Sequence, residues 1–410
     1  MTIYKLGEIA TVEISGVDKK TKDGEIPVKL CNFVDVYYKW AITSDLEQKF
    51  MEATARTNEI ERFKLKRGQV ALTKDSETRF DIGIATYVAD DFDNVILGYH
   101  NALITPNPEK LSGKYLNALL HTDYARTYFA NNASGSGQRY ALSIDALNNF
   151  PVPLLPLAEQ ERIGDIFSSI DQKIALNRAI NDNLEAMAKQ LYDYWFVQFD
   201  FPNEEGKPYK SSGGKMIWNE KLKREIPENW LHKDIKSFMR IFTGKKDVSK
   251  AIPGPYKFFS CAPEPITSDE YIYDGAAVLV SGNGSYTGRV NFYKGKMDLY
   301  QRTYACVVKE DESTIPFFYY TLRYLFQPIF SGGKHGSSIP YIVLGDLADF
   351  MFAYNVDVVK LFVENISAIF NKRIVLQQEI ENLTKQRDEL LPLLMNGQVS
   401  VNYHLSDNGV

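Results

Sequence analysis

The longest regular pattern of hydrophobic and polar positions covers residues 157–196, in the middle of the chain. Apolar residues recur there every three or four positions, among them Ile166, Phe167 and Ile174, and the stretch contains no proline. This spacing is typical of a helix, because strand residues alternate between two faces. The pattern therefore predicts one helix of about 60 Å, long enough to cross a small domain.

A seam of residues seven positions apart follows this helix, and a second segment, residues 361–391, has the same repeat. The polar Asn177 interrupts the first seam, and such a residue tends to fix register and partner. We expect the two segments to pair as a coiled coil, although an ordinary amphipathic helix on a globular core would show similar spacing. The predicted seam is Ile163, Ile170, Asn177, Leu184 and Leu191 with Ile369, Leu376, Leu383 and Leu390.

The chain also repeats itself at an offset of about 200 residues. An offset this long is not a solenoid repeat. It indicates a duplicated module, in which a mixed α/β domain is followed by a long helix. The matching pairs of segments are residues 171–184 with 371–383, 134–153 with 331–353, and 63–74 with 271–282.

The repeat sets the predicted domain boundaries. Residues between the first helix and the second module are rich in Pro, Gly, Ser and charge, which is typical of a linker. We therefore predict an α/β domain in residues 1–153, a long helix in 154–200, a linker in 201–228, a second α/β domain in 229–355, a second long helix in 356–395 and a tail in 396–410.

Composition limits the cellular setting. Cys31, Cys261 and Cys306 lie far apart in no CxxC pattern, which fits a reducing cytoplasm and argues against disulfides or structural zinc. We expect no membrane span, because no stretch of 18 apolar residues exists, and residues 2–14 look like a first strand and not a signal peptide.

The charge is nearly balanced. The chain has a net charge of -5, residues 1–150 carry 18 Lys and Arg against 20 Asp and Glu, and residues 198–356 carry 20 against 18. Any nucleic-acid surface must therefore be local, or a partner chain must supply neutralising charge.

Catalytic motifs are largely missing from the sequence. Gly282 and Gly284 have the spacing of the first two glycines of a GxGxxG dinucleotide loop, but the third position, 287, is not glycine. No GxxxxGK[ST], HExxH or GxSxG pattern is present. No Asn-Pro-Pro-aromatic or Asp-Pro-Pro-aromatic tetrad is present either, so we expect no catalysis and no metal site in this chain.

Four polar loops have nucleic-acid character, at residues 73–79, 134–139, 281–289 and 331–338. Ser and Thr donate to phosphates, and Arg, Lys, Asn and Gln can pair with base edges. Each loop alone could be a solvated turn, but their matched positions in the two modules favour a function. The candidate DNA-binding residues are Lys74, Ser76, Arg79, Ser136, Gln138, Arg139, Ser281, Asn283, Tyr286, Arg289, Lys334, His335 and Ser337.

The layout resembles the specificity subunits of type I restriction-modification systems. The resemblance rests on the duplicated module, on the segment PVPLLPLAEQERIGDIF at residues 151–167, on WFVQFDFP at 195–202, on IPENW at 226–230 and on LLPLLMNGQV at 390–399. The recognition loops carry no family-wide motif, as expected where members differ in DNA target.

The resemblance implies a fold of two target recognition domains with an antiparallel coiled coil and pseudo-two-fold symmetry. It implies a non-catalytic chain that reads a bipartite site in double-stranded DNA, half a site per domain, with the helices setting the spacer. The implied partners are two methyltransferase subunits, which bind S-adenosylmethionine, and restriction subunits, which use ATP and Mg. Two alternatives stay open: a two-headed scaffold that binds proteins, and an unrecognised nuclease or methyltransferase.

Overall fold

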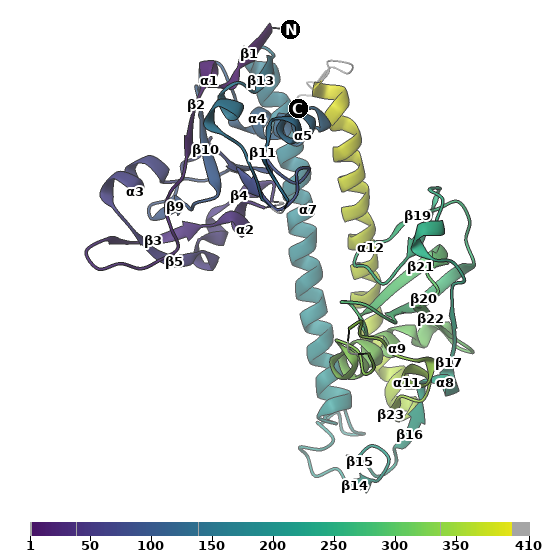
Figure 1. Cartoon of the computed structure of the whole chain (residues 1–410). Helices are drawn as coiled ribbons and strands as arrows, with labels where there is room; N and C mark the ends of the chain where they lie inside the picture. Colours follow the sequence, from purple (N-terminus) through teal and green to yellow (C-terminus); the bar gives the residue numbers. More distant parts are fainter. Residues whose placement is uncertain (1, 38, 138, 337, 396–410) are drawn as a thin grey trace, which may run out of the picture. The chain divides into compact units, whose positions relative to one another are not determined.

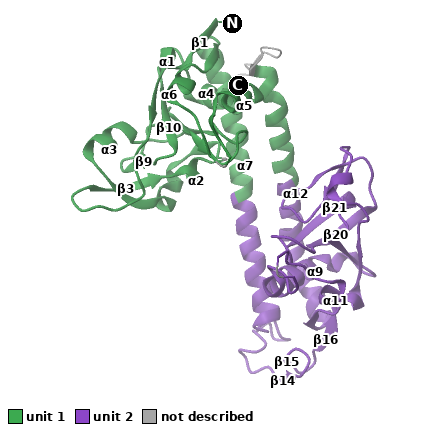
Figure 2. Ribbon diagram, viewed as in Figure 1, with its two compact units in different colours: residues 1–178, 378–410 green, residues 179–377 purple. Residues whose placement is uncertain are grey.

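The computed structural model describes residues 2–37, 39–137, 139–336 and 338–395. The chain divides into two compact units, coloured in Figure 2: residues 1–178 with 378–410 form unit 1, and residues 179–377 form unit 2. Each unit therefore contains one α/β body and one half of each long helix. The predicted tail, residues 396–410, lies outside the described residues.

The body of unit 1 has a five-stranded sheet, in the order β2-β10-β6-β8-β4, between two hydrophobic clusters (Figure 1). On one face, Tyr115 of α4, Phe129 of α5 and Phe150 are buried together. On the other face, a second sheet in the order β5-β3-β9 packs through Val28 and Leu30. Both faces of the central sheet are thus buried, which explains why β6 and β8 are buried at every position.

The bounds of the elements of unit 1, up to the first long helix, are as follows. The strands are β1 (Thr2–Lys5), β2 (Ala10–Ile14), β3 (Ile26–Cys31), β4 (Ala41–Ile42), β5 (Met51–Ala55), β6 (Val70–Thr73), β7 (Asp75–Ser76), β8 (Ala85–Val88), β9 (Val95–Leu97), β10 (Asn101–Pro106), β11 (Ser134–Ser136), β12 (Arg139–Ala141) and β13 (Pro151–Leu154). The helices are α1 (Leu6–Ile9), α2 (Phe33–Val36), the 3₁₀ turn η1 (Ser44–Lys49), α3 (Thr57–Phe63), α4 (Gly113–Leu120), α5 (Asp123–Asn132) and α6 (Ile144–Asn148).

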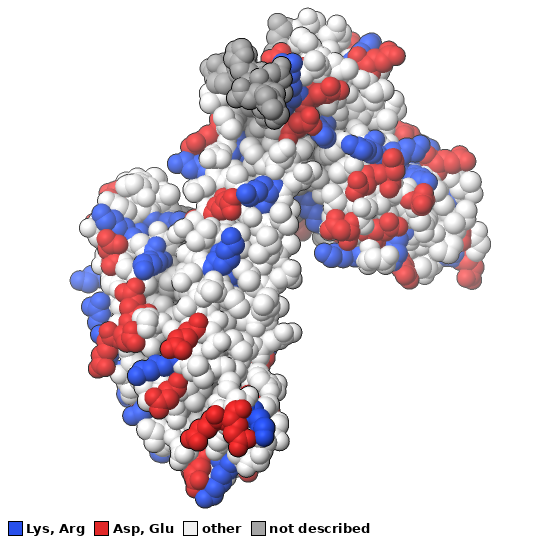
Figure 3. All heavy atoms as spheres, turned by 180° about the vertical axis from the view of Figure 1, so that it is seen from behind, with Lys and Arg blue, Asp and Glu red and all other residues white. Residues whose placement is uncertain are grey.

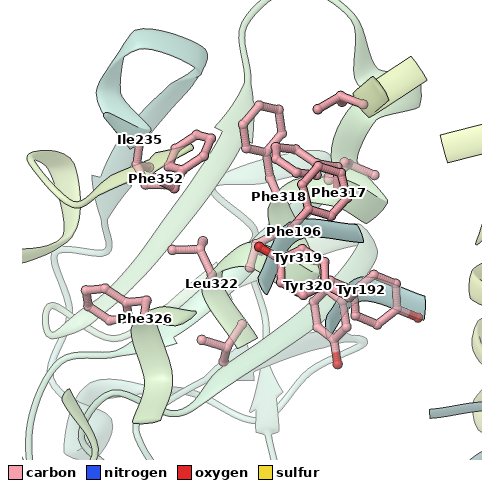
Figure 4. Close-up of a cluster of buried hydrophobic side chains, with 14 of the residues drawn as sticks. Tyr192, Phe196, Ile235, Phe317, Phe318, Tyr319, Tyr320, Leu322, Phe326 and Phe352 are labelled. Atoms are coloured by element: carbon pink, nitrogen blue, oxygen red, sulfur yellow. The ribbon is translucent and has the colours of Figure 1, made fainter. Parts of the chain in front are cut away.

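The body of unit 2 has a six-stranded sheet in the order β17-β22-β20-β21-β18-β19. Its helical face is packed with aromatic rings, and Figure 4 shows Phe317, Phe318, Tyr319 and Tyr320 converging on it. Phe317 lies 4.9 Å from Phe196, ring centroid to centroid. Aromatic side chains bury large apolar areas, so this cluster supplies most of the core of unit 2.

The bounds of the elements of unit 2, up to the second long helix, are as follows. The strands are β14 (Met216–Asn219), β15 (Arg224–Pro227), β16 (Leu231–Asp234), β17 (Met239–Thr243), β18 (Tyr256–Phe259), β19 (Ile266–Ser268), β20 (Tyr273–Ser281), β21 (Val290–Leu299), β22 (Thr303–Val308) and β23 (Met351–Tyr354). The helices and turns are η2 (Asp193–Val197), α8 (Ile235–Phe238), η3 (Val248–Lys250), η4 (Glu312–Thr314), α9 (Ile315–Thr321), η5 (Leu322–Phe326), α10 (Gln327–Phe330) and α11 (Leu344–Ala348).

The central sheets of the two units have equivalent strands. In unit 1, β6 pairs with β10 so that Ala71 faces Leu103. In unit 2, β20 pairs with β22 so that Leu279 faces Ala305. The same strand order and register follow from the sequence repeat, which aligns residues 63–74 with 271–282.

The long helices are α7 (Leu157–Tyr192) and α12 (Val356–Met395). Within unit 1, Lys173 Nζ lies 2.9 Å from Glu379 Oε1. Within unit 2, Glu185 Oε2 lies 2.5 Å from Arg373 Nη1, and the rings of Tyr192 and Phe362 are 6.0 Å apart. Residue numbers rise along α7 as they fall along α12, so the helices are antiparallel. Pro392 lies inside α12, which continues to Met395.

The seam between the helices is wider than the predicted set. Ile163, Asn177 and Leu376 are 1%, 3% and 2% exposed, whereas the other predicted seam residues are half-buried: Ile170, Leu184, Leu191, Ile369, Leu383 and Leu390. A second seven-residue series is also buried, through Phe167, Ile174 and Ala188 in α7 and Val359, Ile366, Ile380 and Leu394 in α12. Two such series are what a coiled coil requires.

A buried polar network joins the long helices within unit 2. The Glu185 carboxylate pairs with Arg373 and accepts a hydrogen bond from the Tyr324 hydroxyl at 2.6 Å. Arg323 Nε lies 3.8 Å from the same carboxylate. Burial and the neighbouring carboxylate raise the pKa of Tyr324, so its hydroxyl stays a donor.

A corresponding junction in unit 1 uses an arginine and aromatic rings. The guanidinium of Arg387 lies 5.8 Å from the ring centroid of Trp40, and the Trp40 and His121 rings are 4.5 Å apart. Burial lowers the pKa of His121 to about 4. Burial raises the pKa of Asp171, on α7, to about 6, although Arg387 and Arg178 oppose this shift.

Residues 201–228, predicted as a linker, are instead folded onto unit 2. They contain the hairpin β14–β15, and the Phe201 ring stacks on Tyr209 at 4.8 Å and lies 5.2 Å from Trp230. Asp200 accepts hydrogen bonds from the backbone N–H and the hydroxyl of Ser211. The prediction failed because Lys, Glu, Gly and Pro dominate the composition while a few aromatic residues anchor the segment.

The predicted helix boundaries also shift slightly. Residues 151–154 form β13, which pairs with β1, so α7 begins at Leu157 and not at residue 154. Its last turn widens into the π-turn η2, where Trp195 and Phe196 are buried. The first strand, expected across residues 2–14, is interrupted by the short helix α1, whose Leu6 and Ile9 are buried in the core.

Candidate nucleic-acid interface

The two predicted loops of unit 1 meet in one small sheet. The hairpin β11–β12 pairs with β7, so Tyr140 faces Ser76 and Ser136 faces Arg139. Gly135 has a φ of +127°, and a Cβ there would lie 2.1 Å from the Arg139 carbonyl oxygen. Only glycine fits this close approach, so the hairpin depends on it. Residues 73–79 and 134–141 therefore form a single surface, which we call reading surface 1.

The charged side chains of reading surface 1 differ in their exposure and in their ion pairs. Arg79 and Arg139 are exposed, and the Arg79 guanidinium lies 5.4 Å from the centroid of the Tyr140 ring. Lys74 is held back, because its Nζ lies 2.6 Å from Asp75 Oδ2. The same carboxylate oxygen lies 2.6 Å from His100 Nδ1. The two arginines are therefore the cations best placed to reach a ligand.

A groove of about 460 Å³ opens beside these residues. Carboxylates in it can accept hydrogen bonds from the amino groups of cytosine, and arginine can donate to guanine. Burial raises the pKa of the Asp81 carboxyl in this groove. The groove is lined by Phe33, Tyr37, Asp75, Ser76, Glu77, Thr78, Asp81, His100 and Arg139.

The two predicted loops of unit 2 also meet. The backbone N–H of Gly284 donates to the Pro340 carbonyl at 2.9 Å, and the N–H of Ile342 donates to the Gly282 carbonyl at 2.9 Å. Tyr341 forms isolated bridges with both Asn283 and His335. Tyr341 thus occupies the place that Tyr140 has in unit 1, and residues 281–289 with 331–342 form reading surface 2.

Reading surface 2 exposes aromatic and cationic side chains. Tyr286 is 47% exposed, and the Arg289 guanidinium lies 5.1 Å from its ring centroid. His335 stacks on Tyr341 with centroids 5.3 Å apart. Asp346 holds this segment in place, since its carboxylate lies 3.1 Å from His335 Nε2 and 3.8 Å from the exposed Lys334.

Two predicted contacts need correction. Ser281 is 4% exposed, and its hydroxyl faces the Cys261 carbonyl at 3.5 Å, so it cannot reach a ligand in this arrangement. Arg289 is half-buried and donates to the Ala262 carbonyl, which ties it to the neighbouring loop. Ser281 was misplaced because strand β20 extends through it. Gln138 and Ser337 lie outside the described residues.

Several residues at these surfaces were not predicted. Tyr140 and Tyr341 follow directly after the two Gly/Ser loops, and comparison of the repeats could have found them. Asp75, His100 and Asp346 were not predicted, because they act through the neighbouring cations and no motif in the sequence marks them. The carboxylates hold the neighbouring cations in place and add hydrogen-bond acceptors to each surface.

The charge around these surfaces is mixed. On the face of each unit that Figure 3 shows, Lys and Arg are interspersed with Asp and Glu, which agrees with the near balance of the whole chain. Among the described residues, no group of three His, Cys, Asp or Glu side chains could hold a metal ion. None of the described helices combines the length and apolar character needed to cross a membrane.

Comparison with known proteins finds a matching family model and several related proteins. Residues 1–186 match the model of the type I restriction modification DNA specificity domain. The chain is 30% identical over 190 residues to the type I restriction enzyme EcoDI specificity subunit of Escherichia coli. Residues 1–186 thus resemble a DNA specificity domain, and the related proteins are type I restriction enzyme specificity subunits. The description of the matched model concerns DNA specificity.

The alignments with these specificity subunits cover only part of each protein. The aligned region covers 45% of this chain and 42% of the E. coli relative. The MjaIX specificity subunit of Methanocaldococcus jannaschii is 23% identical over 316 residues, which cover 70% of this chain and 69% of that protein.

A solved structure has a similar fold over almost the whole chain. The structure of a type I restriction-modification S subunit from M. genitalium aligns with a TM-score of 0.59 and 15% identity, covering 96% of this chain and 95% of that one. The predicted mixed α/β fold, with two long helices and an internal duplication, is confirmed.

Proposed function

We propose that this specificity-subunit homologue reads a bipartite site in double-stranded DNA, with one half-site for each reading surface. The observation that carries the proposal is the matched construction of the two surfaces. In each unit, two polar loops far apart in sequence are joined by backbone hydrogen bonds next to a tyrosine, Tyr140 or Tyr341. A duplicated site suits a target with two separated parts.

The side chains support readout of base edges. Arg139 and Arg79 can donate to guanine, and Glu77, which is exposed in the groove, can accept from cytosine or adenine amino groups. In unit 2, Asn283 and Lys334 offer amide and cationic donors. Because the two surfaces carry different side chains on a similar backbone, the two half-sites would differ in sequence.

The long helices would determine the unread spacer between the half-sites, since half-site spacing follows from protein geometry. The chain would recruit two methyltransferase subunits, and restriction subunits could join them. S-adenosylmethionine, ATP and Mg would be bound by these partners. Adenine methylation would require the partner to flip the base out of the duplex. The described cysteines are all free thiols, which suits work in a reducing cytoplasm.

Selection of DNA from a random pool by the assembled complex tests the proposal. Two conserved blocks at a fixed separation are expected, with affinity that falls steeply as salt rises. Binding without sequence preference, or a single uninterrupted block, would contradict it. A protein scaffold, the alternative function, would bind its partners independently of DNA.

A further inference from the structure

One face of the central sheet is covered by different elements in the two units. In unit 1, Ala71 and Leu103 on this face are 0% and 1% exposed, because the second sheet β5-β3-β9 covers them. In unit 2, the equivalent residues Leu279 and Ala305 are also buried, at 3% and 0% exposed, but every member of their cluster lies on the sheet's own strands. No second sheet covers this face among the described residues of unit 2.

Aromatic and cationic side chains occupy this face instead. We call it the open sheet face and define it by Arg240, Phe242, Lys257, Phe259, Tyr273 and Tyr293. The four rings are half-buried and pack in pairs, Phe242 with Tyr273 at 5.6 Å and Phe259 with Tyr293 at 4.8 Å between centroids.

A glycine pair explains why the tyrosine rings lie flat on the sheet. Gly275 faces Gly295 across β20 and β21, and both have positive φ. The Tyr273 hydroxyl lies 2.7 Å from where a Gly275 Cβ would be, and the Tyr293 hydroxyl lies 3.3 Å from the corresponding point at Gly295. The rings therefore cover backbone that the glycines leave bare, as in aromatic rescue of strand glycines.

Cations cap these rings on the solvent side. The Arg240 guanidinium lies 5.0 Å from the Phe242 centroid, and Lys257 Nζ lies 5.1 Å from the Tyr293 centroid. A groove of about 500 Å³ runs beside Arg240 and is also lined by Lys245 and Lys246. Glu270 and Asp298 also line this groove, so the excess positive charge of the outer layer comes from Arg240, Lys245 and Lys257.

The cations of this groove are unequally neutralised. Lys246 pairs with Glu270, and its Nζ lies 3.2 Å from Asp298. Within the described part of the chain, neither Arg240 nor Lys245 has a carboxylate within 4.0 Å, and both are exposed. At the position equivalent to Phe242, unit 1 has Glu13, which pairs with Arg62 of the covering layer.

We propose that the open sheet face binds the phosphate backbone of duplex DNA next to the half-site read by unit 2. Two exposed cations without carboxylate partners suit a polyanion, and the rings beneath them hold the guanidinium of Arg240 in place. The face adjoins reading surface 2, because β20 runs about 20 Å from Gly275 to the loop that starts after Ser281. The inference rests on the proposed function, and it makes unit 2 bind more flanking DNA than unit 1.

The test uses the full chain assembled with its methyltransferase subunits. Arg240→Ala/Lys245→Ala removes two positive charges from the open sheet face. Lys19→Ala/Lys20→Ala is the matched control, because it removes two exposed lysines from unit 1. Binding is measured across salt concentrations on two duplexes that both contain the two half-sites. One duplex ends at the second half-site, and the other continues beyond it for about 15 base pairs. At ~3.4 Å per base pair, this extension is long enough to reach past the face.

The first variant should reduce the slope of log affinity against log salt by about 2, and should weaken binding about tenfold or more near 0.1 M salt. The advantage of the longer duplex should disappear, and the recognised sequence should stay unchanged, as expected for backbone contacts. The control should match the wild-type protein.

Three results would overturn the inference: an unchanged slope in the first variant, an equal loss in the control, or weaker assembly with the methyltransferase at an unchanged slope. The last result would assign the face to an acidic protein partner. If the wild-type complex shows no sequence-specific binding, the proposed function fails instead, so the two failures are distinguishable.

Discussion

The Glu185 network gives the sharpest test of how the long helices are held together within unit 2. Glu185→Ala removes the carboxylate that pairs with Arg373 at 2.5 Å and accepts from Tyr324 at 2.6 Å. The Arg373 guanidinium would then be left in a largely buried position, where an unpaired charge is costly.

The expected magnitude follows from the burial of the pair. Removing one partner of a fully buried ion pair costs about 3–5 kcal/mol. The Glu185 and Arg373 side chains are 23% and 18% exposed, so water compensates part of the loss. We therefore expect the free energy of local opening at this junction to fall by about 2–3 kcal/mol, which corresponds to about 30–150-fold faster exchange of protected amides.

Amide hydrogen exchange of residues 181–192 and 366–377 in the full chain is the assay. Glu228→Ala is the matched control, because Glu228 also pairs with a cation, Lys215, at 2.5 Å, but the side chains are 42% and 70% exposed. Such a surface pair contributes about 0–1 kcal/mol. If Glu185→Ala accelerated exchange no more than Glu228→Ala, the reasoning would be refuted.

A double variant separates the cost of an unpaired charge from the value of the pair. Glu185→Leu/Arg373→Leu removes both charges and leaves apolar side chains at the seam. Replacing a buried ion pair by apolar residues is often neutral. The double variant should therefore recover most of the lost protection, whereas similar losses in the single and double variants would show that the ion pair itself stabilises the junction.

Three further predictions concern unit 1. Asp171→Asn should raise the free energy of unfolding by about 1–2 kcal/mol above pH 6 and leave it unchanged below pH 4. The reason is that burial raises the pKa of Asp171 to about 6, so ionisation of this carboxyl opposes folding. Denaturant titrations at both pH values check this, and a pH-independent change would contradict it. Gly135→Ala should abolish reading of the first half-site without lowering the melting temperature, since its Cβ would meet the Arg139 carbonyl at 2.1 Å. Gly16→Ala, with open space around it and no positive φ, should retain reading. Arg139→Ala should relax specificity at one position of the first half-site by about 1–3 kcal/mol and leave the second half-site unchanged in DNA selection.

The sequence predicted the parts of the fold that rest on local periodicity and on the repeat. The heptad spacing of α7 and α12 identified both helices, because a seam residue every seven positions is visible without tertiary information. The second buried seven-residue series of these two helices was not predicted, because the polar residues Asn181, Arg373 and Arg387 interrupt it.

Other features depend on contacts that no short pattern reveals. The second sheet of unit 1 pairs β3 with β5 and β9, which lie far apart in sequence and have no counterpart in the other module. The folded segment 201–228 is anchored by a few rings such as Phe201 and Tyr209 within a polar stretch. Composition alone therefore indicated a linker.

The candidate site was predicted as loops but not as surfaces. The matched positions of residues 134–139 and 331–338 were visible in the sequence, whereas their pairing with 73–79 and 281–289 needed the register of the sheets. Ser281 was wrong because strand β20 continues one residue into the predicted loop and buries its side chain.

A map of modified bases tests the central claim most directly. The chain is expressed with its methyltransferase in a host that lacks adenine methylation, and methylated positions are read across the genome. The account predicts one bipartite motif, absent without this chain, in which Arg139→Ala alters only one half. A single uninterrupted motif, or no new methylation although the complex assembles, would contradict it.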